Sequence, residues 1–167
     1  MFALSNEKLV WAPVWYLFKH KAGEPVSPAS LLATERFSGN MVLESGIKEM
    51  FKLIIGSGGA AFNTANTYIG VGDSAAPAAA GQTDLQAAVN KTYKKVEPTF
   101  PYIDGTTMIF QAAFYENDAN YNWNEFCIRN GMGSGSVCLN RKVEDKGRKN
   151  GGIWVLRCEI TLASVAE

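Results

Sequence analysis

The feature that most constrains this chain is the alternation of apolar and polar residues in its C-terminal half. Residues 153–162 (IWVLRCEITL) place one set of side chains on a single strand face: Trp154, Leu156, Cys158, Ile160 and Leu162. Arg157, Glu159 and Thr161 alternate with them on the outer face. A side-chain period of two is that of a β-strand with one buried face. The same spacing predicts a strand at 106–116, and less regular runs predict strands at 67–71, 121–129 and 136–143.

Turn-forming residues separate these runs and keep the predicted strands short. Tight turns favour the pairs Asp104-Gly105, Asn117-Asp118, Asn130-Gly131 and Gly151-Gly152. One stretch, 41–55, has apolar residues at helical spacing, with Asn40 as its N-cap and Gly56 at its end. Several closely spaced strands with one helix near the N-terminus predict an all-β fold, an antiparallel β-sandwich of jelly-roll type. We expect one such domain over 41–167, with the helix 41–55 included.

Residues 1–40 are less regular, because three prolines interrupt a mixture of aromatic and polar residues. Two interpretations are open: a strand and loop on the core of the domain, or an extended N-terminal arm laid on a neighbouring molecule. We adopt the arm, since an aromatic cluster on a partner supplies anchors for binding. The predicted interface residues of this arm are Trp11, Trp15, Tyr16 and Phe18.

The charge balance excludes several classes of partner. Sixteen basic residues balance sixteen acidic ones, so the formal net charge is zero and the basic excess typical of nucleic-acid binding is missing. The longest apolar run, 9–18, has ten residues and contains Pro13, which is too short for a membrane span. We therefore expect neither nucleic acid nor membrane as a partner, and no signal peptide. Low net charge favours association with other proteins.

The stretch 68–86 (YIGVGDSAAPAAAGQTDLQ) begins like a nucleotide-binding turn. A dinucleotide fingerprint needs a third glycine at the start of a helix, but Ala75 occupies that position and Pro77 follows it. We interpret the glycines as a structural corner before a loop of small residues, with Asp73 and Ser74 hydrogen-bonded inside the turn.

The remaining reactive residues form no recognisable catalytic or metal-binding pattern. His20 is the single histidine, and Cys127, Cys138 and Cys158 lack the spacing of zinc ligands, which predicts free, buried thiols. Asp118 begins a partial calcium-loop pattern (with Asn120 and Asn122) that lacks its glycine and its final glutamate. We predict no enzyme activity, no metal and no cofactor.

The order of motifs in 68–164 resembles a group of tailed-bacteriophage virion proteins. The motifs are YIGVGDSAAPAAAGQTDLQA, VEPTFPYIDGTTMIFQAAFYENDANYNWNEFCIRNG, LNRKV and GGIWVLRCEITLAS. The resemblance implies a virion structural protein, assembled in the host bacterial cytoplasm, that forms a homo-oligomer, with a trimer favoured. Its leading interpretation is a capsid decoration (cement) protein that binds the major capsid protein and stabilises the head shell.

Two alternatives remain open at this stage. One is a tail, collar, baseplate or fibre protein, which the same β-module would suit. The other is a carbohydrate-binding module for a host surface, with Tyr121 and Trp123 exposed in a shallow groove.

Overall fold

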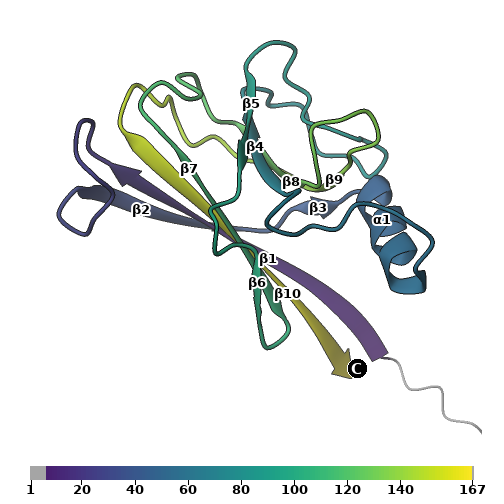
Figure 1. Ribbon diagram of the computed structural model, residues 1–167. Helices are drawn as coiled ribbons and strands as arrows, with labels where there is room; N and C mark the ends of the chain where they lie inside the picture. Colours follow the sequence, from purple (N-terminus) through teal and green to yellow (C-terminus); the bar gives the residue numbers. More distant parts are fainter. Residues whose placement is uncertain (1–6, 167) are drawn as a thin grey trace, which may run out of the picture.

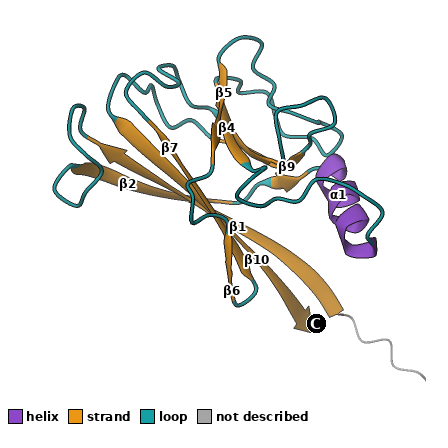
Figure 2. Cartoon of the chain, in the orientation of Figure 1, coloured by secondary structure: helices purple, strands orange, loops and turns teal. Residues whose placement is uncertain are grey.

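The computed structural model describes residues 7–166, and it confirms an all-β sandwich with one helix (Figures 1 and 2). The first sheet has the strand order β2-β1-β10-β7-β6 and the second sheet the order β3-β9-β8-β4-β5, each with five strands. All the strand pairs are antiparallel. The elements are β1 (Glu7–His20), β2 (Leu31–Ser38), β3 (Met41–Val42), α1 (Glu44–Ile55), β4 (Tyr68–Gly72), β5 (Lys91–Lys95), β6 (Tyr102–Asp104), β7 (Thr107–Phe114), β8 (Glu125–Arg129), β9 (Cys138–Val143) and β10 (Ile153–Ala166).

The core lies between the two sheets and is rich in aromatic rings. Trp123 is fully buried and meets the rings of Phe114 and Trp154 edge-on, each with its centroid 4.8 Å away. Edge-to-face pairs of this kind add about 0.5–1.5 kcal/mol to the free energy of area burial. The predicted face of 153–162 is confirmed in β10 for Leu156, Cys158 and Ile160, which are fully buried, whereas Leu162 is only half-buried. The two sheets therefore enclose one continuous core.

The prediction of an arm over 1–40 requires a correction. Strand β1 pairs with β10 along its whole length and with β2 from Val14 onward, so it is an inner strand of the first sheet. Trp15 is fully buried and stacks on Phe37 of β2, with ring centroids 6.2 Å apart. Residues 7–38 thus belong to the sandwich, and the domain boundary at residue 40 was wrong. Residues 1–6 lie outside the described part of the chain.

The helix is confirmed, but it begins later than predicted. Met41 and Val42 form β3 beside β9, and Leu43 occupies the N-cap position without a side-chain cap. Asn40 instead accepts a hydrogen bond from the Trp11 indole, so it was wrongly assigned as the cap. Gly56 ends the helix in the left-handed conformation, with φ 68°, as a C-terminal glycine usually does. Within residues 7–166, no helix combines the length and the apolar character that crossing a membrane requires.

A candidate interface on the overhanging sheet

The first sheet extends past the second at one end. Strand β2 pairs with β1 no further than Val14, and β7 pairs with β10 no further than Thr161. Residues 7–12 and 162–166 therefore continue as a two-stranded ribbon that projects beside α1 (Figure 1). Trp11 and Leu162 are directly paired across this ribbon, so their side chains share one face. The ribbon leaves that face without cover from the second sheet.

An apolar groove of about 320 Å³ separates the ribbon from the helix. Its walls come from Leu9, Trp11 and Leu162 on the ribbon, and from Val42, Ile47, Met50, Phe51 and Ile54. These side chains are apolar, so the groove offers hydrophobic contact. The Trp11 indole is the one side-chain hydrogen-bonding group among the groove residues named here, and it already donates to Asn40.

The helix that forms one wall presents its large apolar side chains to solvent. Phe51 is 61% exposed, Ile54 78% and Ile55 74%. The helix contacts the second sheet through Gly46 instead, where a Cβ would lie 2.5 Å from the Leu139 carbonyl oxygen. An amphipathic helix usually buries its apolar stripe and exposes its polar face. The last turns of α1 have the opposite arrangement, and exposed apolar patches of this kind are typical of contact surfaces.

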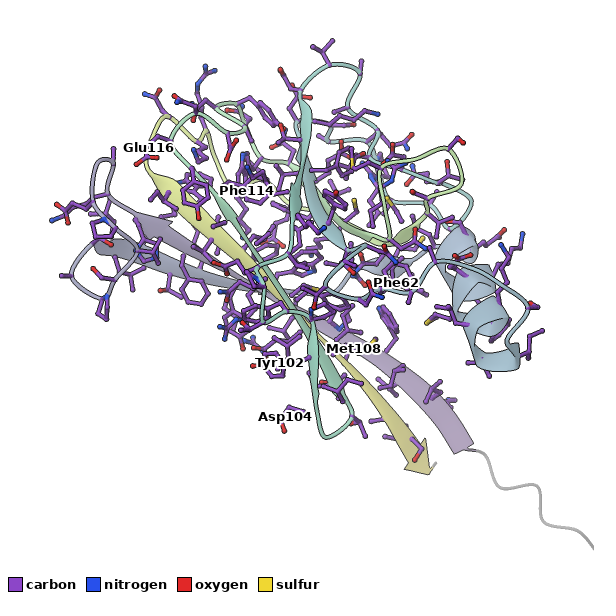
Figure 3. All side chains as sticks on the ribbon, viewed as in Figure 1. Phe62, Tyr102, Asp104, Met108, Phe114 and Glu116 are labelled. Carbon is purple, nitrogen blue, oxygen red and sulfur yellow. The ribbon has the colours of Figure 1, made fainter. Side chains whose placement is uncertain are left out.

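A second, smaller hollow of about 210 Å³ lies on the same sheet, between β6, β7 and the loop after α1. Phe62, Tyr102 and Met108 lie around it, and Asp104 lies near the tip of the β6–β7 hairpin (Figure 3). Met108 pairs with Ile160 on one side and with Ile103 on the other, and Ile103 is 75% exposed. We refer to the exposed or half-buried apolar set on this end of the molecule as the overhang surface: Leu9, Trp11, Phe51, Ile54, Ile103, Met108 and Leu162.

The four predicted interface aromatics are not brought together. Trp11 belongs to the overhang surface, whereas Trp15 lies in the core of its own sandwich. Tyr16 and Phe18 lie on the outer face of the first sheet, where their rings stack with centroids 6.3 Å apart. The period of two along β1 separates them, because even and odd positions point to opposite faces.

The sequence predicted a helix over 41–55 from the spacing of its apolar residues, but it did not identify its exposed apolar side chains as a candidate site. The local signal was the isoleucine pair with Phe51 in the last turn before Gly56. Such a turn carries more apolar surface than one contact face can bury.

No family model, curated protein or solved structure matches this chain.

The charged groups of the second sheet hold a loop in place. Glu125 and Arg141 are fully buried and joined at 2.7 Å. Glu125 also accepts hydrogen bonds from the backbone of Gln86 and Ala87, while Arg141 donates to Gln82 and to the Ala76 carbonyl. Both partners therefore use their hydrogen-bonding groups on each other and on the loop 73–90, and neither side chain is accessible to solvent.

The glycines at the start of this loop lie in β4 rather than in a turn, which corrects the predicted corner. A Cβ on Gly72 would collide with the Glu125 carboxylate, and one on Gly70 would lie 2.8 Å from the Cys127 sulfur. The two positions are glycine because neighbouring side chains fill the space above them.

The partial calcium pattern is satisfied by the protein itself. Asp118 forms an ion pair with Lys94 at 2.9 Å and accepts a hydrogen bond from the Tyr115 backbone. Burial opposes ionisation of this carboxyl, but these contacts outweigh it and lower its pKa. Asn120 accepts from the Lys149 ammonium group. The oxygens of this loop therefore serve as acceptors for protein donors.

The exposed groove expected for a carbohydrate does not form from the residues proposed for it. Trp123 is fully buried, and its indole donates to the Ala119 carbonyl. The Tyr121 hydroxyl bonds the Val71 carbonyl and Thr92. Because a sugar stacks on an accessible ring face, the prediction that these two rings are exposed was wrong.

Proposed function

We propose that this protein is a non-enzymatic virion structural subunit of a tailed bacteriophage, a capsid decoration protein that binds the head shell as a homo-oligomer. The observation that carries the proposal is the overhang surface, where Phe51 and Ile54 remain largely exposed around an apolar groove. Contiguous apolar surface on a folded domain is typical of protein–protein contact sites. The virion setting comes from the sequence resemblance over 68–164.

A second copy of this chain is the occupant that we assign to the groove. The overhang surface holds the groove, and Ile54 on its wall and the adjacent Ile55 are both largely exposed, so the end of α1 offers apolar side chains to the groove of another copy. Burying one aliphatic side chain contributes about 1.5–3 kcal/mol. The formal net charge of zero leaves no long-range repulsion between copies.

A ring is the arrangement that we assign to this contact. When the end of α1 in one copy enters the groove of the next and the contact is not returned, the contact is heterologous, and it closes into a ring where the rotation between copies permits closure. A trimer is the smallest ring of this kind, and it agrees with the oligomer that the resemblance implies. Among the described residues, β2 pairs with β1 only from Val14 onward, so β2 does not extend along residues 9–12 of the ribbon.

The oligomeric state tests this assignment directly. Light scattering coupled to size exclusion measures the mass of the wild type and of Ile54→Asp, with Val89→Asp as the control. Val89 is 84% exposed in the loop 73–90, away from the overhang surface. We expect an oligomer for the wild type and for Val89→Asp, and a monomer for Ile54→Asp. A monomeric wild type, or an Ile54→Asp variant that still assembles, contradicts the use of this surface between copies.

The head-shell role needs a separate measurement. Co-sedimentation with undecorated capsids should capture the wild type and Val89→Asp, and should capture less of Ile54→Asp if trimerisation precedes attachment. A wild type that oligomerises but ignores capsids and joins tails would support the tail alternative. The position of the gene beside a capsid gene or a tape-measure gene gives an independent check.

A further inference from the structure

Two cysteines and one aspartate converge at the centre of the second sheet, on the side covered by the loop 73–90. Cys127 lies on β8 and Cys138 on the neighbouring strand β9, with their sulfur atoms 3.3 Å apart. Asp84 reaches them from the loop, and its Oδ1 lies 3.5 Å from the Cys138 sulfur. The three candidate ligand atoms all lie within 4.8 Å of one another. Both thiols are fully buried.

Two of these separations, Cys127–Cys138 and Asp84–Cys138, approach those of atoms bound to one tetrahedral zinc ion. With Zn–S near 2.3 Å and Zn–O near 2.0 Å, a sulfur and an oxygen on one ion lie about 3.5 Å apart, and two sulfurs about 3.8 Å apart. The Asp84–Cys138 pair already has this separation. The two sulfurs would need to move apart by about half an ångström, which a change of side-chain torsion provides.

We propose that Asp84, Cys127 and Cys138 bind one divalent, thiophilic cation of the zinc class. The Cys138 thiol faces two acceptors at once, the Cys127 sulfur and the Asp84 carboxylate, but it has a single proton to donate. A cation takes the place of that proton. Two thiol protons leave to solvent as the ion binds, so the net charge of the cluster is unchanged. Two sulfur ligands favour zinc over magnesium or calcium.

The surrounding residues hold the aspartate in position. Arg129 donates to its Oδ2 at 3.2 Å, and the Tyr93 hydroxyl donates to its Oδ1. Hydrogen bonds of this kind orient carboxylate ligands in metal sites. With three ligands from the protein, the fourth position of a tetrahedral ion is left to a water molecule. The Asp84 side chain is 30% exposed, which gives a cation access from solvent.

The bound ion would fasten the loop 73–90 to the second sheet, independently of any association between copies. Asp84 is the loop residue in the cluster, and the ion would join it to Cys127 on β8 and to Cys138 on β9. Spacing along the chain does not reveal this set, since its members come from a loop and from two neighbouring strands.

Cobalt is the spectroscopic probe for this site. Reduced, chelator-treated protein is titrated with Co²⁺, whose thiolate complexes show a sulfur-to-cobalt charge-transfer band and visible bands typical of tetrahedral geometry. We expect one equivalent to bind the wild type and the control Cys158→Ser, which removes a buried thiol from the main core. Cys127→Ser and Cys138→Ser should bind at least about tenfold more weakly, and Zn²⁺ should displace the cobalt.

A measurement on the wild type alone guards against variants that fail to fold. Zn²⁺ should slow the alkylation of Cys127 and Cys138 in partly denaturing conditions while leaving Cys158 unaffected, as mapped by mass spectrometry. It should also raise the melting temperature, because the ion binds the folded state. Absent charge-transfer bands, unchanged alkylation, or a Cys127–Cys138 disulfide in protein isolated without oxidant would each overturn the proposal.

Discussion

The second sheet and the overhang surface differ in the kind of side chain that they bury and the kind that they expose. The second sheet buries charged side chains, with Glu125 and Arg141 fully enclosed. The overhang surface exposes apolar ones, with Ile54 and Ile103 each about three-quarters accessible. The buried charges are satisfied by partners inside the chain, whereas the exposed apolar groups have no such partner within the described residues. The difference separates a region whose buried charges are paired within one molecule from a region whose apolar side chains reach solvent.

Breaking the buried ion pair should have the largest effect on stability. Arg141→Met leaves the Glu125 carboxylate buried without its cation, and loss of one partner of such a pair costs about 3–5 kcal/mol. Urea denaturation measures the change in the free energy of unfolding. As a control, Lys21→Ala breaks the exposed pair with Glu24 and should change it by less than about 1 kcal/mol.

A double variant sharpens this result. Glu125→Gln combined with Arg141→Met removes both charges, so it should be less destabilised than Arg141→Met alone. Equal losses in the single and double variants would show that the hydrogen bonds to the loop, and not the buried charge, dominate.

Trp15 and Trp11 lie on the same face of β1, so variants at these two positions compare the core with the overhang surface directly. Trp15→Ala empties a site in the core and should cost about 3–5 kcal/mol. Trp11→Ala, in the overhang surface, should cost less in a monomer, because its ring is only half-buried. Chemical denaturation at low protein concentration separates the two variants. A cost for Trp11→Ala as large as that for Trp15→Ala would mean that the overhang surface is already part of the core.

The register of β10 gives a third comparison. Leu156→Ala should cost about 2–5 kcal/mol, because the side chain is fully buried. Thr161→Ala should cost about 0.5–1.5 kcal/mol, since it removes the hydrogen bond to the Thr107 hydroxyl at 2.7 Å. Thermal melting ranks the two, and equal shifts would contradict the assigned faces.

The smallest expected effect concerns the pH dependence of stability through Glu49. Burial opposes ionisation of this carboxyl, but hydrogen bonds from the Ala60 backbone, Lys52 and Asn130 outweigh it and lower the pKa from its ordinary value of 4.5. A lowered folded-state pKa stabilises the protein above that ordinary value, and the stabilisation is lost as pH falls through the folded pKa. Denaturation at a series of acidic pH values should show a shallower decline for Glu49→Gln than for the wild type. Identical slopes would contradict the assignment.

The sequence predicts the C-terminal strands well because each has a buried face and a clear turn after it. The strand interpretation of β1 was set aside in favour of an arm because prolines, Pro13 among them, interrupt residues 1–40. The Pro13 carbonyl accepts a hydrogen bond from the Gly39 backbone N–H, so it faces the side of β1 on which β2 lies. The nitrogen and the carbonyl of one strand residue face the same side, and the pairing with β2 has already ended at Val14. Proline has no N–H to donate, but no β2 residue needs a donor at this position. The sequence alone does not show why proline is tolerated at position 13, because the reason depends on where β2 ends.

The candidate interface was harder to predict than the fold. The spacing of Met50, Phe51 and Ile54 is that of a helix packed on a core, and nothing local tells whether a neighbouring element covers the stripe. Coverage depends on where the second sheet ends and on the close contact that Gly46 permits with β9. The cluster of Asp84, Cys127 and Cys138 was missed for the related reason that strand pairing, and not spacing, brings its members together.

The long pairing of β1 with β10 also has a mechanical consequence. Residue 7 lies opposite residue 166, so a pull that separates these two positions loads one pair of backbone hydrogen bonds at a time. The hydrogen bonds of the ribbon would then break one after another, which requires little force. A pull directed along the strands in opposite senses would load all the pairs together and meet much greater resistance. A tether at this end of the molecule is therefore weak against peeling and strong against shear.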